Sequence, residues 1–219
     1  MFFDDDITVT LETLESYIQA LQVYSDASFF GGKIYIDWQG DAPVWLKSDD
    51  LVLLNGLFGK YDLGGKDIEY EAKHMLPFGA NFMLRRSLIE QVGFFDTRLG
   101  VKGNAIGRGE ETDYFNRAKK KGLNGMYIAG AHVGHRFQKE RINLVYLYRY
   151  GIEKGRSEVL VANRASYKNC VTVILSSLLF ILRGIFQLIK SRRDRFYQCI
   201  INAGIEYGFW RETKKKSEL

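Results

Sequence analysis

The chain is poor in the residues that mark disordered, disulfide-stapled or fibrous proteins. It has 219 residues but only two prolines and two cysteines, and no biased repeat. Scarce proline and 46% apolar residues exclude a disordered or low-complexity chain. Cys170 and Cys199 have no metal-like spacing and lie in apolar surroundings. We therefore expect reduced cysteines and a cytosolic compartment. The length fits one large domain or two small ones.

A glycine-rich phosphate loop and an internal repeat are also missing, and Met1 is followed by two Phe and three Asp in place of a secretory signal. The net charge is a modest +5. Much of the excess follows Arg141, in the clusters Lys190–Arg195 and Arg211–Lys216, whereas the first 140 residues are closer to balanced. This distribution does not favour nucleic acid as a partner. It favours an anionic membrane surface near the C-terminal end.

The hydrophobic pattern predicts an α/β fold in the first part and helices alone in the second. Helices are predicted at Leu11–Tyr24, Asp50–Phe58, Ser87–Val92 and Glu110–Lys121, and strand-like segments at Phe2-Phe3, Ser28–Ile36, Leu76–Leu84 and Asn124–Ala129. Four glycines in Gly100–Gly109 predict a flexible loop. We place a boundary near Arg141, which gives domains 1–140 and 141–219.

An acidic triplet follows the apolar pair Phe2-Phe3. Ligand sites in open α/β sheets lie beyond the C-terminal ends of strands. Asp4 and Asp6 are two residues apart, so both can reach one ion from a turn. Carboxylate oxygens are the ligands that Mg²⁺ and Mn²⁺ prefer. The alternative is a solvated turn or a helix N-cap.

Two later segments carry further candidates. Gly107–Asp113 is a glycine-rich approach to a helix that begins with carboxylates. It could hold a general base beside a mobile loop, or the acids could only stabilise the helix dipole. His132 and His135 follow the last predicted strand, and Arg136 is adjacent. One histidine could be a third metal ligand or a phosphate contact, or both could be ordinary packed or surface residues.

Taken in order, these motifs resemble family 2 of the GT-A glycosyltransferases. The likeness runs from Phe2 to about Ser157 and combines F-F-D-D-D (Phe2–Asp6), P-F-G-A-N-F-M-L-R-R (Pro77–Arg86), V-G-F-F-D-T-R-L-G (Val92–Gly100), G-E-E-T-D (Gly109–Asp113) and Tyr127 with His135-Arg136. The pieces at Pro43–Leu46 and Tyr61–Gly64 are similar to bacterial members that build surface polysaccharides.

The resemblance implies a partial GT-A fold with a Rossmann-like mixed sheet. It also implies an inverting transfer of a sugar from a nucleotide-diphosphate donor to a glycan or lipid-linked acceptor, with Mn²⁺ or Mg²⁺ as cofactor. The residues it assigns are Asp4, Asp6 and His135 to the metal, Glu111 or its neighbour Glu110 to the general base, and Asp5, Gly79, Ala80, Asn81, Asp113 and Arg136 to donor or acceptor binding. We expect the side chains of Asp6 and His135 to lie within about 10 Å. Glu111 is expected at a helix N-terminus facing the same cleft.

The nucleotide-binding half that precedes the D-x-D in that family is absent. We therefore expect a truncated product, a fragment, or a chain whose missing half is supplied by a separate partner. A non-catalytic membrane-binding or partner module left from such an enzyme is the alternative function. A glycosidase also uses paired carboxylates, but the D-x-D and the missing second-carboxylate pattern disfavour it.

The C-terminal segment contains two apolar stretches, Val171–Leu188 and Phe196–Trp210. The first is slightly short for a span and has Arg183 near its middle. We favour helices in the membrane interface at the cytoplasmic face, over a true span or a helix packed on the catalytic domain.

Overall fold

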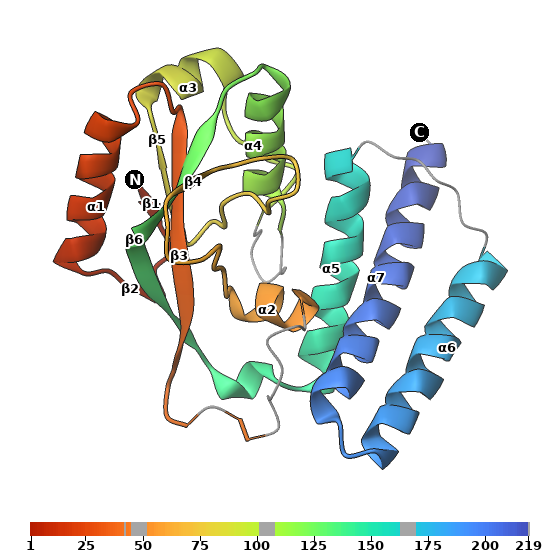
Figure 1. The fold of residues 1–219 in the computed structure, drawn as a ribbon. Coiled ribbons are helices and arrows are strands. Elements are labelled where there is room, and N and C mark those ends of the chain that lie inside the picture. Colours follow the sequence, from red (N-terminus) through yellow and green to blue (C-terminus); the bar gives the residue numbers. More distant parts are fainter. Residues whose placement is uncertain (42, 45–51, 101–107, 163–169, 219) are drawn as a thin grey trace. The chain divides into compact units, whose positions relative to one another are not determined.

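The structure is a computed structural model that describes residues 1–41, 43–44, 52–100, 108–162 and 170–218 (Figure 1). Most of the loop predicted at Gly100–Gly109, and part of the Pro43–Leu46 motif, fall outside these ranges. The chain divides into two compact units. The first contains residues 1–39, 58–96 and 110–137, and the second contains residues 40–57, 97–109 and 138–219.

The first unit is built on a mixed sheet, as the fold class predicted. Its strands are β1 (Phe2–Phe3), β2 (Ile7–Thr8), β3 (Phe29–Trp38), β4 (Ile68–Glu69), β5 (Asn81–Leu84) and β6 (Gly125–Phe137). The spatial order is β1-β5-β3-β6-β2, with β4 also paired to β6. Among the strands that the structure describes, β3 and β6 run parallel and the other pairs are antiparallel.

The two central strands are longer than the sequence pattern predicted. Ser28–Ile36 was expected to form one or two short strands, and it is one ten-residue strand, β3. Its register with β6 shifts between Gly32 and Ile34. At Gly32 the Ala131 carbonyl comes so close that a Cβ would overlap it. Glycine is therefore required at this point of the strand.

β6 corrects the predicted placement of the histidines. The strand was expected to end at Ala129, but it continues to Phe137, so His132 and His135 lie within it. Its second half gains partners on both sides, β3 from Ile34 onward and β2 at Ile7 and Thr8. These backbone hydrogen bonds sustain a segment that is rich in Gly and His and therefore a weak strand former alone.

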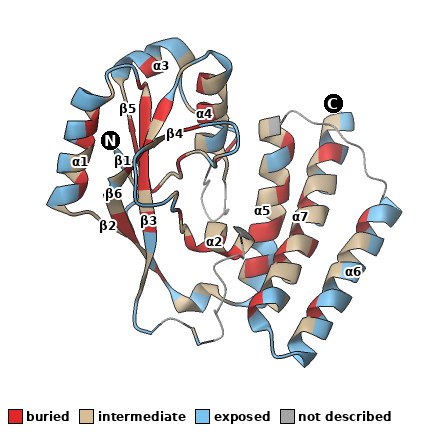
Figure 2. Ribbon diagram, in the orientation of Figure 1, coloured by how far each residue is buried: buried red, intermediate tan, exposed pale blue. Residues whose placement is uncertain are grey.

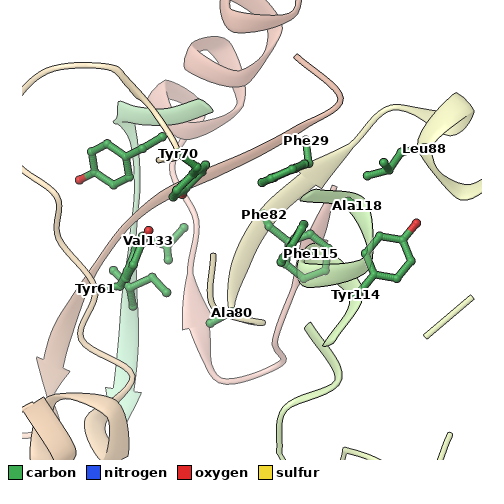
Figure 3. Packing of buried hydrophobic residues seen from close by; sticks show 12 residues of the cluster. Phe29, Tyr61, Tyr70, Ala80, Phe82, Leu88, Tyr114, Phe115, Ala118 and Val133 are labelled. Carbon is green, nitrogen blue, oxygen red and sulfur yellow. The ribbon is translucent and has the colours of Figure 1, made fainter. Parts of the chain in front are cut away.

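The helices of the first unit cover both faces of the sheet. They are α1 (Leu11–Val23), α3 (Arg86–Val92) and α4 (Glu110–Lys120), close to the predicted ranges. One face packs Phe29 and Phe82 against Phe115 of α4, in a cluster that includes Tyr127, and Figure 3 shows the rings of Phe29, Phe82 and Phe115 close together. The other face packs Phe30 and neighbouring apolar residues against α1. The successive residues Phe29 and Phe30 point to opposite faces, as the period of a strand requires.

The second unit is mainly helical. It contains α2 (Val52–Phe58, whose last residue belongs to the first unit), the 3-10 turn η1 (Lys139–Arg141), α5 (Leu144–Ala162), α6 (Cys170–Ile189) and α7 (Arg193–Ser217). Gly151 and Gly155 of α5 face the Ile201 and Ile205 carbonyls, and Gly204 and Gly208 of α7 face carbonyls of α5. Paired small residues four apart let the two backbones touch. In the described residues, α6 is the one helix long and apolar enough to cross a membrane.

Candidate functional site

The acidic triplet lies in the turn between β1 and β2. This short hairpin places Asp4 and Asp6 beside the second half of β6, because β2 pairs Ile7 with His135. The Arg136 N–H donates a hydrogen bond of 2.9 Å to the Asp6 carbonyl and fixes the end of the turn. Asp6 Oδ1 then lies 3.4 Å from His135 Nε2. Two residues far apart in the sequence therefore meet, well within the predicted 10 Å.

His135 is oriented by the end of α2. Its Nδ1 lies 2.7 Å from the Phe58 carbonyl oxygen. A carbonyl only accepts, so Nδ1 carries the proton and, in the neutral ring, the Nε2 lone pair points at Asp6. Gly59, with φ of +72°, lies against the ring, and a Cβ there would come within 3.1 Å of Nδ1. The imidazole is thus held in one orientation and one tautomer by main-chain atoms.

His132 does not join this group. It lies three residues before His135 in one strand, and an odd separation puts the two side chains on opposite faces. Its ring is near Tyr35, and its carbonyl accepts a 2.6 Å hydrogen bond from Thr13. Arg136 points away from His135 for the same reason, and its side chain is exposed. The structure therefore selects His135 from the two histidines.

Glu111 comes from the helix α4, in the last of the three segments that form the first unit. It lies in the first turn of α4, as predicted, and its Oε1 sits directly above Gly79, where a Cβ would come within 2.3 Å. Gly79 therefore provides the space that the carboxylate occupies. Ala80, the next residue, is buried. Glu110 is the neighbouring acid, and its Oε2 is buried with no hydrogen-bond partner among the described residues.

The pKa of Asp4 depends on the other charged groups of this site. Asp4 as a residue is exposed, yet its carboxyl is partly desolvated, and this desolvation raises its pKa. The carboxylates of Asp6, Glu111 and Asp5 raise the pKa further, while His135 lowers it. Asp6, Glu111 and His135 thus all lie within electrostatic range of Asp4, and we call these four residues the acid–histidine cluster. The crowding of negative charge favours the binding of a proton or a cation.

In the described part of the chain, no three His, Cys, Asp or Glu side chains are grouped closely enough to hold a metal ion alone. The Asp6–His135 pair nevertheless fits two neighbouring ligands. Around an octahedral ion with bonds of about 2.1 Å, such ligands lie roughly 3 Å apart. A site of this kind takes its remaining ligands from water and substrate phosphate.

Asn81 and Asp113 have structural partners. Asn81 is fully buried, donates to the Lys33 and Ala131 carbonyls, and accepts from the Tyr17 hydroxyl. Its amide connects β5 to β3 and β6 through these hydrogen bonds. Asn81 therefore has a structural role in fixing the end of the Gly79–Asn81 segment. Asp113 forms a 2.8 Å ion pair with Arg117. Arg117 also donates to the Val92 and Phe94 carbonyls and so connects α4 to the end of α3.

Replacing Arg117 with Ala should lower the free energy of unfolding by about 1–3 kcal/mol, because two carbonyls and a partly buried carboxylate lose their donor. Urea denaturation followed by circular dichroism measures this. Arg86→Ala is the matched control, since the Arg86–Glu90 pair is 3.7 Å apart and almost entirely exposed. It should change stability very little. Equal losses in the two variants would contradict the structural role of Arg117.

Comparison with known proteins gives one informative likeness. Over 160 residues the chain is 24% identical to the glucosyl-dolichyl phosphate glucuronosyltransferase of Haloferax volcanii. The match covers 71% of this chain and 48% of that protein, so the chain spans about half the length of the curated relative. No family model matches, and no solved structure matches. Over most of its length, the chain is similar to a glycosyltransferase.

Proposed function

We propose that this chain is the metal- and acceptor-binding part of an inverting GT-A glycosyltransferase of family 2. The observation that carries the proposal is the acid–histidine cluster. Within one unit, Asp6 contacts His135, and Glu111, from a third distant stretch of the sequence, lies within electrostatic range of Asp4. Their types match a transfer reaction, which needs a cation near the departing diphosphate and a base near the acceptor hydroxyl.

The fixed tautomer of His135 supports a cation between the two partners. Because Nδ1 is bonded to the Phe58 carbonyl, Nε2 is the ring nitrogen that faces Asp6 Oδ1 at 3.4 Å, a spacing that a cation between the two atoms would fit. Asp6 and His135 would hold a Mn²⁺ or Mg²⁺ ion, with Asp4 close by. The bound ion would supply positive charge to the diphosphate of the donor as it leaves.

Glu111 is the proposed general base. Glu111 lies in the first turn of α4, and its carboxylate occupies the space that a side chain at residue 79 would fill. The carboxylate would accept the proton of the acceptor hydroxyl. A single base suffices for a direct displacement, which inverts the anomeric carbon and requires no covalent nucleophile. Glu110, in the same turn of α4, is the neighbouring candidate for the base.

The substrate class is proposed from the relative. That protein is named for transfer of a glucuronosyl group to glucosyl-dolichyl phosphate. We infer that the donor here is a nucleotide sugar and the acceptor a sugar linked to a lipid phosphate, at the cytoplasmic membrane face. A role in surface polysaccharide synthesis is part of the same proposal, as is a separate segment or chain that contributes nucleotide contacts.

A transfer assay tests the proposal. The transferase containing this chain is incubated with Mn²⁺, a panel of uridine and guanosine diphosphate sugars, and glucosyl polyprenyl phosphate. Mass spectrometry should detect a lipid one sugar heavier with one donor, and the product should vanish with Asp6→Asn. Asp26→Asn, an exposed acid away from the acid–histidine cluster, should retain activity. Transfer that is unaffected by Asp6→Asn would overturn the proposed site.

A further inference from the structure

One side of α6 is entirely apolar and faces outward within its unit. Its exposed side chains recur every three or four residues, so they lie along one stripe of the helix. Figure 2 shows α6 largely in the colour of exposed residues. The stripe consists of Val171, Leu175, Leu178, Leu182, Ile185 and Ile189, which are 48% to 76% exposed. Such a continuous apolar surface is unusual for a monomer in water.

The other side of α6 packs on α7. Ser176 donates a 3.2 Å hydrogen bond to Glu206, and Gly184 lies against Phe196 and Cys199. The two helices therefore run antiparallel along most of α6, and Ser176 and Gly184 are on the inner side. The apolar stripe lies on the side of α6 that α7 does not cover.

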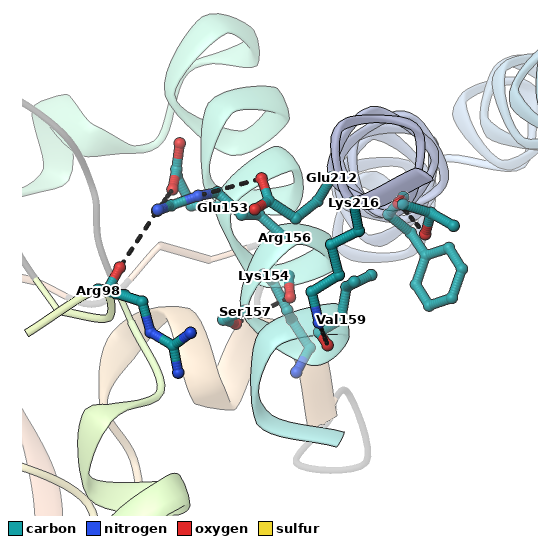
Figure 4. A network of polar contacts seen from close by, with 10 residues as sticks. Arg98, Glu153, Lys154, Arg156, Ser157, Val159, Glu212 and Lys216 are labelled. Carbon is teal, nitrogen blue, oxygen red and sulfur yellow. Dashed lines mark hydrogen bonds and ion pairs between the residues drawn. The ribbon is translucent and has the colours of Figure 1, made fainter. Parts of the chain in front are cut away.

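A membrane-crossing orientation of α6 conflicts with the charged side chains that lie between α7 and its neighbouring helices. The contacts of Gly204 and Gly208 hold α7 against α5 with both helices running in the same direction. Between them lies an ionic network (Figure 4): Arg156 pairs with Glu153 at 3.2 Å and with Glu212 at 3.5 Å. If α6 crossed the bilayer, α7 would carry Glu206, which accepts a hydrogen bond from Ser176 inside α6, into hydrocarbon beside this network.

The basic residues at the end of α6 indicate which kind of surface contacts the apolar stripe. Lys190, Arg192, Arg193 and Arg195 are exposed, and Asp194, the one acid in this segment, is buried. Lys190 Nζ lies 4.4 Å from the Phe186 ring, so cationic and apolar groups are adjacent. A protein partner normally meets a surface with polar groups in it, whereas this stripe has none. Apolar side chains beside a basic cluster match acyl chains below anionic head groups.

We propose that α6 lies in the plane of an anionic membrane, with its apolar stripe in the acyl boundary and the 190–195 basic cluster at the head groups. The helix acts as a monotopic anchor, and α7 packs on the side of α6 that faces away from the membrane. This inference goes beyond the proposed transfer reaction, and its test requires no activity.

Flotation of the full chain with vesicles tests the anchor. The chain should float with phosphatidylcholine–phosphatidylglycerol vesicles and much less with phosphatidylcholine alone. Leu178→Glu with Leu182→Glu should reduce partitioning at least about tenfold. Ile18→Glu with Val23→Glu, at exposed apolar positions of α1, is the matched control and should float normally. Replacing Lys190, Arg192, Arg193 and Arg195 with Gln should remove the preference for anionic lipid.

The depth of α6 distinguishes an in-plane anchor from a span. With Cys170→Ser and Cys199→Ser as background, single fluorescent labels are placed at residues 171, 178 and 189, all on the stripe. Quenching by lipids spin-labelled at different depths should give one shallow depth for the three positions. A deeper middle label would overturn the in-plane orientation. Failure to float would overturn the proposal, as would a dimer in sedimentation that the Leu178→Glu and Leu182→Glu changes dissolve.

Discussion

Glu111→Gln should slow sugar transfer at least about 100-fold, the scale on which a positioned general base contributes. The amide keeps the size and hydrogen-bonding reach of the carboxylate but cannot take the acceptor proton. Donor affinity should survive, because the role of Glu111 is confined to the acceptor hydroxyl. Single-turnover rates and equilibrium binding of the nucleotide sugar, measured on the transferase that contains this chain, separate the two quantities.

Glu110→Gln is the control variant that shows which of the two neighbouring acids is the general base. Both acids lie in the first turn of α4, so both variants remove one negative charge from the same helix end. A loss specific to Glu111 assigns the base to the carboxylate above Gly79. Unchanged turnover in Glu111→Gln, with a loss in Glu110→Gln, would move the role to Glu110 and its buried oxygen.

The positions of Glu111 and Asp6 could be predicted from sequence because local rules place them. A glycine approach followed by acids marks a helix start, and an apolar pair followed by acids marks the end of a strand. The structure has both features, at α4 and at the β1–β2 turn. Helical spacing of apolar residues and the stop at Gly93 likewise predict the limits of α1 and α3 within a residue.

Other features depend on contacts that no local pattern carries. β6 extends past Ala129 because β2 and β3 flank it, so the face of each histidine is set by tertiary pairing. His135 is oriented by the main-chain carbonyl of Phe58. Every residue type has this group, so the contact could not be predicted from the residue at position 58. Asn81 lies in a motif associated with substrate binding, yet its amide is buried among backbone carbonyls.

Two features had a usable signal. Asp113 and Arg117 are four residues apart on a predicted helix, a spacing that allows an ion pair. Gly151 and Gly155, like Gly204 and Gly208, have the small-xxx-small spacing of close helix packing. That spacing is typical of close packing between helices, and the structure places α7 against α5.

Removing the cation ligands should affect both stability and rate. With Mn²⁺ and uridine or guanosine diphosphate as the probe, the melting temperature of the unmodified protein should rise, because a ligand that binds only the folded state stabilises it by about 2.7 kcal/mol at 100 times its dissociation constant. Asp6→Asn and His135→Ala should abolish this rise and lower the transfer rate at least about 100-fold. His132→Ala, on the opposite face of the same strand, is the matched control and should keep the metal-dependent shift.

Asp4 adds a pH dependence with a definite sign. Its pKa in the folded protein is raised above the usual 3.8, so between these values the folded state holds more protons than the unfolded state. Without cation, this residue should therefore make the protein less stable as pH rises through the raised pKa, and Asp4→Asn should remove that decline. Mn²⁺ should restore stability above that pKa, since it offsets the charge that deprotonation creates. Melting curves across this pH range, with Mn²⁺ or with chelator, measure both effects. Identical curves with Mn²⁺ and with chelator would mean that the acid–histidine cluster binds no cation, and the base assigned to Glu111 would then have to act without one.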